Sequence, residues 1–176
     1  MIHYTDRSIF DISEAFWLVC PVNCVGVMGK GLAKEFKGRI KSRNLDIYVE
    51  MCHTEELKIG EVLSLAMCWD SLAHVGEIPA DRHGVIFFPT KDHWRDKSCL
   101  SWIEAGLVGF QKLVKNHAKT FSCRTYAFPM LGCGCGGLDW KDVQPLMERY
   151  FAPLDAEIWI STYEATTCVK KPTDGR

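Results

Sequence analysis

Short apolar runs mark the predicted strands of this chain. Residues 16–22 and 85–88 are continuously apolar, which in so short a run is typical of a strand covered on both faces. Residues 61–66 alternate between polar and apolar as a half-buried strand does, and residues 125–128 and 157–160 are interpreted as two further strands. The pattern therefore predicts a strand at each of these five places.

Helical periodicity falls between the strands. Residues 32–37 are good helix formers, and residues 44–53 repeat apolar side chains at steps of three and four. Ser98 is the predicted N-cap of a long helix that reaches about His117 and carries one apolar stripe. Asp139 is the predicted N-cap of the last helix. Strands that alternate with helices predict an α/β fold with helices on both faces of one sheet.

Three loops follow predicted strands directly. They span residues 23–31, 89–95 and 131–140, and Pro89 is expected to end the strand before the second of them. Ligands of open α/β sheets bind beyond the carboxyl ends of the strands, so a single crevice can collect all three loops. Residues 69–84 give the weakest pattern, and both a hairpin and an excursion over the site stay open for them.

Length and charge limit the kind of protein this can be. The 176 residues suffice for one substantial core, and we expect one domain over residues 1–165 with a polar tail over residues 166–176. The formal net charge is −1, which excludes a bulk basic field and confines any nucleic-acid contact to a local surface. Neither a signal peptide nor a membrane span is expected, because acid and base precede any apolar run and no stretch of 18 apolar residues occurs.

The nine cysteines point to an intracellular protein. Their number is odd and their spacing is unlike a secreted disulfide framework. Reduced thiols and a cytoplasmic location are therefore expected. Cys133 and Cys135 invite a zinc interpretation, but no Cys-x-x-Cys pair and no His-x-x-x-His motif accompany them. Small space-filling side chains are the favoured interpretation, and no metal or cofactor is expected.

Two of the loops are rich in glycine. Glycines at 26, 29 and 31, and at 132, 134, 136 and 137, allow positive φ angles and let backbone N–H groups point at a phosphate. Each loop runs into a predicted helix N-terminus, which favours an anion. Neither loop matches the P-loop or the dinucleotide-binding fingerprint. The pattern therefore indicates a diphosphate cradle of another kind, while plain tight turns stay an alternative.

Lys91 is the candidate catalytic side chain of the second loop. Partial burial after so apolar a strand would disfavour its charged form and make the amine a nucleophile or a proton carrier. Periodicity alone favours the alternative of a solvated lysine. His93 is either an acid–base partner or a surface residue, and Trp94 either stacks on a base or covers the core.

These loops together resemble a known family. The blocks NCVGVMGKGLA at 23–33, FPTKDHWR at 88–95 and LGCGCGGLDW at 131–140 resemble macrodomains of the DarG type, the DNA ADP-ribosyl glycohydrolase antitoxins. The resemblance covers about residues 1–162 in the same order. The chain is also similar to the terminal ADP-ribose protein glycohydrolase branch of macrodomains.

The resemblance implies a three-layer α/β/α macrodomain with a central mixed sheet that binds ADP-ribose. By the family pattern Asn23 faces the distal ribose and the modified base. Lys91 matches the lysine assigned to catalysis in enzymes that remove ADP-ribose from thymidine bases of single-stranded DNA. The remaining residues implied to bind the ligand are Gly26, Val27, Met28, Gly29, Lys30, Gly31, Thr90, His93, Trp94, Gly132, Cys133, Gly134, Cys135, Gly136 and Gly137.

Three departures from the family pattern stand out. Cys20 replaces an asparagine that the family often carries, so the hydrogen bonds of that asparagine are in doubt. Gly136 stands where the protein-directed branch has an acidic residue, which leans away from a protein substrate. Residues 69–84 are longer than the usual connection.

A hydrolase that reverses DNA ADP-ribosylation is the leading hypothesis. A non-catalytic ADP-ribose reader, and a hydrolase of ADP-ribosylated protein or of ADP-ribose 1″-phosphate, are the alternatives. The implied partners are ADP-ribose, ADP-ribosylated single-stranded DNA and a cognate DNA ADP-ribosyltransferase toxin, with no membrane and with a monomer as the default. Host antitoxin, phage counter-defence protein and repair enzyme are all compatible with the sequence.

Overall fold

A mixed six-stranded sheet forms the centre of the protein. The computed structural model describes residues 1–66, 84–120 and 124–163. The strands are β1 (Ile2–Thr5), β2 (Trp17–Asn23), β3 (Leu63–Ala66), β4 (Gly84–Lys91), β5 (Thr125–Pro129) and β6 (Glu157–Ser161). Their order is β1-β6-β5-β2-β4-β3, and all neighbours are parallel except β3, which runs antiparallel to β4 at the edge.

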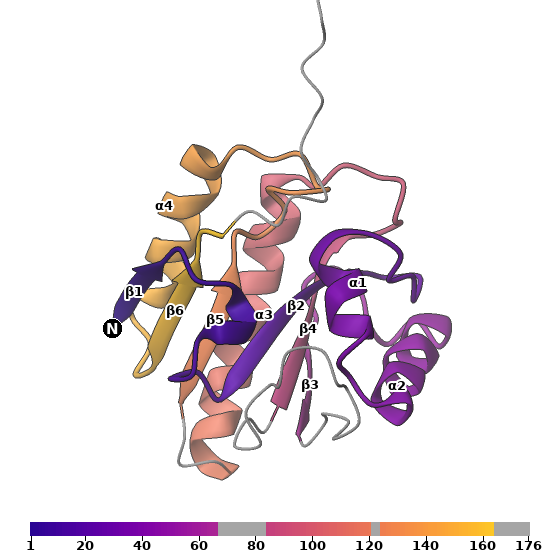
Figure 1. Ribbon diagram of the computed structural model, residues 1–176, viewed down its shortest axis with the longest axis horizontal. Helices are drawn as coiled ribbons and strands as arrows, with labels where there is room; N and C mark the ends of the chain where they lie inside the picture. The colour runs from indigo at the N-terminus through magenta and orange to yellow at the C-terminus, as the bar shows by residue number, and fades with distance from the viewer. Residues whose placement is uncertain (67–83, 121–123, 164–176) are drawn as a thin grey trace, which may run out of the picture.

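Helices cover both faces of the sheet (Figure 1). One face carries the 3₁₀ helix η1 (Ile9–Asp11), α1 (Gly31–Lys37) and α2 (Ser42–His53), and the other carries α3 (Leu100–Thr120) and α4 (Trp140–Phe151). The predicted three-layer α/β/α architecture with a mixed sheet is therefore confirmed.

Alternation along the central strands divides the core into two halves. In β2, Leu18 and Cys20 pack with η1, α1 and α2, while Trp17 and Val19 pack with α3 and α4. All four side chains are at most 1% exposed. A strand buried on both faces needs apolar side chains at consecutive positions, which explains the continuous apolar run that predicts β2.

Two strand predictions need correction. Strand β4 does not end at Pro89 but continues to Lys91. Pro89 pairs with Val22 of β2, and the register shifts directly after this pair, because an irregularity is where a sheet tolerates a residue without an N–H group. The sequence pattern also missed β1, a four-residue edge strand paired in parallel with β6.

One predicted helix cap is wrong and one is confirmed. Among the residues that the structure describes, the buried hydroxyl of Ser98 finds no hydrogen-bond partner. The carbonyl oxygen of Cys99 accepts the first helical bond of α3, from Trp102. Asp139 does cap α4, since its Oδ1 accepts from the backbone N–H of Lys141 at 3.0 Å. The interior pattern thus located both helices better than it located the start of α3.

Two segments discussed from the sequence lie mostly outside the residues that the structure describes. The segment expected over residues 69–84 lies outside the described residues apart from Gly84, which begins β4, and so does the tail expected over residues 166–176. Within residues 1–66, 84–120 and 124–163, no helix combines the length and the apolar character that crossing a bilayer demands.

A histidine lies inside the α3 face of the core. The ring of His117 stacks on Trp17 with 4.5 Å between centroids, and its two nitrogens lie 3.2 Å from the Tyr126 hydroxyl and 3.0 Å from the Ser64 hydroxyl. The residue is 5% exposed. Burial lowers the pKa of His117 below its usual value of 6.5, so the folded protein keeps the ring neutral.

The free energy of unfolding should therefore fall as the pH falls below about 6.5, because the unfolded chain takes up a proton that the folded chain resists. Replacing His117→Gln keeps hydrogen-bonding groups in place but removes the titration. Urea unfolding of both proteins from neutral to mildly acidic pH should show a flatter pH dependence for the variant. Equal slopes would contradict this assignment, since the other histidines are common to both proteins.

Candidate functional site

Three loops meet at the carboxyl ends of β2, β4 and β5. Strand β2 lies between the other two in the sheet, and the register pairs Asn23, the last residue of β2, with Lys91, the last residue of β4. The backbone N–H of Cys24 then donates to the carbonyl oxygen of Asp92 at 2.9 Å. The two predicted catalytic residues therefore lie side by side where the loops begin.

The side chain of Asn23 shapes the first glycine loop. Its Nδ2 donates to the carbonyl oxygen of Val27 at 2.6 Å, and its Oδ1 accepts from the N–H groups of Val25 at 3.1 Å and Val27 at 3.2 Å. Asn23 is buried, and the loop turns at Gly26 with a φ of 77°. The carboxamide is thus committed to holding the loop in one conformation.

The layer below fixes the backbone at this point. The hydroxyl of Tyr48 on α2 donates to the carbonyl oxygen of Asn23 at 2.8 Å, and the Cys52 thiol approaches the same oxygen at 3.8 Å. Burial, and then the nearby Asp92, raise the pKa of the Cys24 thiol to about 12. Cys24 is therefore protonated at neutral pH and is no candidate nucleophile.

The second glycine loop is packed against the start of α3. The N–H of Ser98 donates to the carbonyl oxygen of Gly136 at 3.1 Å, and the N–H of Leu138 donates to that of Gly132 at 3.1 Å. A Cβ added at Gly136 would lie 2.2 Å from the Gly132 oxygen and 2.4 Å from the Ser98 hydroxyl. A Cβ at Gly134 would meet nothing within 4 Å. Packing therefore requires glycine at position 136 but not at position 134.

Lys91 connects strand β4 to the second glycine loop. Its Nζ donates to the carbonyl oxygen of Cys135 at 2.6 Å, which joins the end of β4 to the second glycine loop. Burial, together with repulsion from the Lys97 ammonium group, holds the pKa of Lys91 below its usual value, and the carboxylate of Asp96 works in the opposite direction. A lower pKa means that a larger fraction of Lys91 carries a neutral amine than an exposed lysine does at the same pH.

A short turn after Lys91 presents Trp94 to solvent. The carboxylate of Asp96 accepts from the N–H of His93 at 2.9 Å, and His93 Nδ1 accepts from the N–H of Arg95 at 3.3 Å. Trp94 is 45% exposed, and the Arg95 guanidinium lies 4.5 Å from the centroid of its ring. An exposed indole stacked on a cation is a surface on which a base can stack.

The N-termini of α1 and α4 offer less to an anion than the sequence predicts. The first turn of α4 already receives the Asp139 carboxylate as its cap. The Lys30 side chain makes no capping bond to α1, a helix of only seven residues. A diphosphate at this site would therefore depend on the N–H groups of the loops themselves.

The predicted binding residues differ in exposure. Gly26, Gly31, His93 and Cys133 are half-buried, and Gly132 and Gly136 are buried. Met28 packs in the core beneath the first loop, and the Thr90 hydroxyl donates to the carbonyl oxygen of Val22 at 3.4 Å, so both side chains support the site from inside. Those that face solvent are Val27, Gly29, Lys30, Trp94, Gly134, Cys135 and Gly137. Cys135 is disulfide-bonded, so the expectation of reduced thiols is wrong for this residue.

Tyr48 and Asp96 are the supporting residues that the sequence reasoning missed. Tyr48 was visible only as part of the apolar stripe of α2, and its hydroxyl carries no pattern of its own. Asp96 carried a usable signal, because an Asp three residues after His93 is a common way to close a short turn. No three His, Cys, Asp or Glu side chains within the described ranges group to hold a metal ion.

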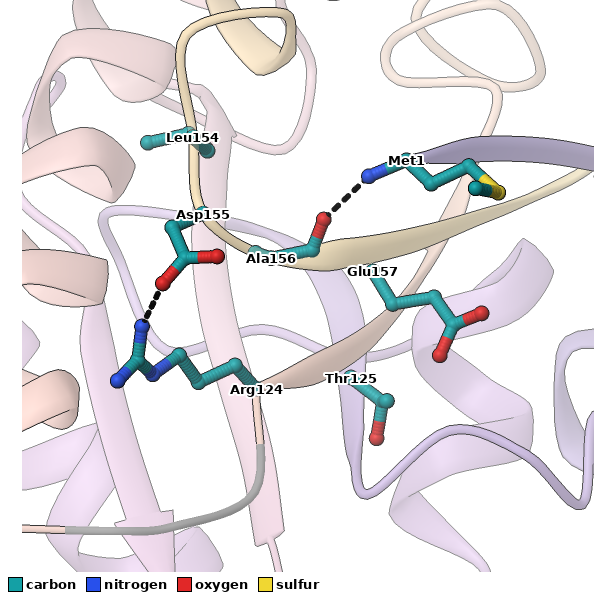
Figure 2. A pocket seen from close by; sticks show the side chains of 7 residues that line it. All are labelled: Met1, Arg124, Thr125, Leu154, Asp155, Ala156 and Glu157. Carbon is teal, nitrogen blue, oxygen red and sulfur yellow. Dashed lines mark hydrogen bonds and ion pairs between the residues drawn. The ribbon is translucent and has the colours of Figure 1, made fainter.

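A hollow lies at the opposite end of the sheet from these loops, where β5 and β6 begin (Figure 2). It is lined by Met1, Arg124, Thr125, Leu154, Asp155, Ala156 and Glu157. Figure 2 shows the Met1 amine bonded to the Ala156 carbonyl oxygen and Arg124 paired with Asp155. These polar groups already satisfy one another, and none of the glycine loops reaches this end, so it is not the candidate site.

Comparison with known proteins finds relatives that match most of this chain. Residues 19–147 match the model of the Macro domain family. A protein of Mycobacterium tuberculosis named "DNA ADP-ribosyl glycohydrolase" is 37% identical over 137 residues, which cover 78% of this chain and 35% of that protein. A "DNA ADP-ribosyl transferase-DNA ADP-ribosyl glycohydrolase fusion protein" of Thermosipho africanus is 40% identical over 152 residues, 81% of this chain and 37% of that protein.

Solved structures from the same two organisms are similar throughout the chain. The macrodomain of Mycobacterium tuberculosis DarG superposes with a TM-score of 0.75 at 34% identity, covering 94% of this chain and 99% of that one. Thermosipho africanus DarTG in complex with ADP-ribose gives 0.73 at 34% identity, covering 91% of this chain and 41% of that one. The chain spans about a third of the length of the curated relatives it matches.

The packing of the second loop can be tested with two alanine substitutions. Gly136→Ala should lower the free energy of unfolding by about 1–3 kcal/mol, because its methyl group collides with the Gly132 oxygen and the Ser98 hydroxyl. Gly134→Ala, in open space on the same loop, should change it by less than about 0.5 kcal/mol. Chemical denaturation measures both, and equal effects would contradict the described loop.

Proposed function

This chain belongs to the Macro domain family, and from that premise we propose that it is a hydrolase that removes ADP-ribose from thymidine bases of single-stranded DNA. The loops at residues 26–31 and 132–137 hold the diphosphate with their N–H groups. Asn23 fixes the first of these loops beside the distal ribose. The observation that carries the proposal is the Lys91 amine, which the strand register sets next to Asn23 and against the second glycine loop.

The names of the relatives support this assignment of substrate. Both curated relatives are named for DNA ADP-ribosyl glycohydrolase activity. Gly136, where the protein-directed branch carries an acidic residue, offers no room for any side chain in the present loop. DNA is therefore favoured over protein as the carrier of the modification.

Lys91 supplies the chemistry in this proposal. Its neutral amine attacks the anomeric carbon of the distal ribose, and a C–N bond forms as the bond to the base breaks. The base leaves with the electron pair and takes up the proton that the lysine nitrogen releases. Water then replaces the lysine, which releases ADP-ribose and restores the amine. The depressed pKa of Lys91, caused first by burial and then by Lys97, favours the neutral form that this step needs.

The setting of the enzyme follows from the same premise. We propose a single macrodomain over residues 1–165 with a tail over residues 166–176, acting as a monomer in the cytoplasm, where its DNA substrate would be met. The Thermosipho africanus relative joins a DNA ADP-ribosyl transferase to a glycohydrolase. We therefore propose a toxin of that transferase class as the partner whose modification this chain reverses.

Removing the amine should abolish turnover and spare binding. Lys91→Ala should slow the release of ADP-ribose from a modified thymidine oligonucleotide by about 100-fold or more. Its affinity for free ADP-ribose, measured by calorimetry, should stay within a few-fold of the wild type. Undiminished turnover by the variant would remove Lys91 from catalysis, and a wild type that binds ADP-ribose but releases none would favour a non-catalytic reader.

The pH dependence of the rate separates a nucleophilic from a cationic role. If the neutral amine attacks, kcat rises with pH up to the pKa of Lys91, and Lys97→Gln should shift the profile to higher pH by removing a repulsive neighbour. Lys112→Gln makes the same charge change on α3, about 18 Å along the helix from Leu100, its first residue, and should leave the profile in place. A rate that falls as the pH rises would show that the charged ammonium group acts instead.

A further inference from the structure

Residues 30–43 form a basic segment in a chain without net positive charge. The segment contains six lysines and arginines and a single carboxylate, that of Glu35. Its formal charge is therefore +5, whereas the whole chain carries −1. So uneven a distribution makes a local field that the overall composition hides.

The charges of the basic segment are available for a partner. Lys34, Lys37, Lys41 and Arg43 are all exposed, and in the parts of the chain that the structure describes none of them takes part in an ion pair. Unpaired surface cations bind phosphates at little cost, since no existing ion pair must be broken.

Arg39 is the exception within the segment. Its guanidinium lies 4.1 Å from the centroid of the Phe10 ring and donates to the carbonyl oxygen of Glu35 at 3.0 Å. Arg39 thus anchors α1 to the core while its neighbours stay free. The exposed charge of the basic segment is therefore carried by its lysines and by Arg43.

The basic segment begins at the candidate site. Lys30 is the N-cap of α1 and belongs to the end of the first glycine loop. Phe36 faces the core from α1, and Lys34 and Lys37 lie on the solvent side of the same helix. Figure 1 shows α1 starting close to the carboxyl end of β2 and leading towards α2 on the outer face of that layer. A chain of phosphates leaving the crevice can therefore follow this face.

We propose that the basic segment binds the sugar–phosphate backbone of the single-stranded DNA next to the modified nucleotide. This inference rests on the proposed function and names the surface that holds the rest of the substrate. Contacts of this kind position a strand without reading its sequence, and they weaken as salt rises. Trp94 is exposed on the turn after β4, three residues beyond Lys91, which pairs with Asn23, and is placed to stack on a base.

Charge neutralisation on matched faces tests the proposal. The first variant carries Lys34→Gln, Lys37→Gln and Lys41→Gln. The control carries Lys112→Gln, Lys115→Gln and Lys119→Gln, which removes the same three charges from exposed lysines of α3, on the opposite side of the sheet. The binding probe is a short unmodified single-stranded oligonucleotide, measured over a series of salt concentrations, with free ADP-ribose as the second ligand.

The first variant should bind the oligonucleotide about tenfold or more weakly at low salt. Its salt dependence should flatten by about 0.7 in log–log slope for each DNA phosphate that the variant no longer neutralises. Its affinity for ADP-ribose should not change, and the α3 control should bind both ligands like the wild type. An unchanged affinity and slope in the first variant, or an equal loss in the control, would overturn the proposal.

Turnover distinguishes a failure of this inference from a failure of the proposed function. With ADP-ribosylated thymidine as a free nucleoside, the first variant should match the wild type, while with a modified oligonucleotide its KM should rise. A wild type inactive on both substrates would overturn the proposed function alone, because oligonucleotide binding is measured separately. Equal KM values for the variant and the wild type on the oligonucleotide would overturn the role of the basic segment.

Discussion

The parallel pairing of β2 with β4 is the constraint on which the site depends. Both strands are central, and helices cover both of their faces, so their register is held by apolar packing on two sides. That register ends with Asn23 beside Lys91, after a shift at Val22. A slip of one residue would turn every core side chain of β2 to the wrong layer. The geometry of the site is thereby tied to the stability of the core.

Side chains that hydrogen-bond to backbone carbonyl oxygens hold the loops in place around the candidate site. The Asn23 carboxamide closes the first loop, Tyr48 holds the Asn23 carbonyl from below, and the Lys91 amine grips the second loop at Cys135. Preformed loops of this kind lose little conformational entropy when a ligand arrives. The same Lys91 contact also keeps the amine near the end of the strand, where the proposed chemistry needs it.

The sequence predicted the strands of the sheet better than the details of the site. Apolar runs locate β2 and β4 because strands covered on both faces leave no position for a polar side chain. Pro89 misled the prediction because its tolerance depends on a register irregularity across the sheet. Ser98 misled it because the second glycine loop buries its hydroxyl. The commitment of Asn23 to its own loop likewise needs the folded turn, which no spacing of residues reveals.

The net charge of −1 is a poor guide to what this protein binds, because positive charges are concentrated in one part of the surface. Lys91 and Lys97 repel each other at the crevice, and the basic segment continues from the first glycine loop along α1. A global positive field would hold unmodified DNA everywhere and slow the search for a modified base. Under the proposed function, a local field leaves recognition to the glycine loops, which would hold the ADP-ribose, while a screened, exposed surface would hold the strand only weakly. Neither binding nor release of the strand would then require a buried ion pair to break.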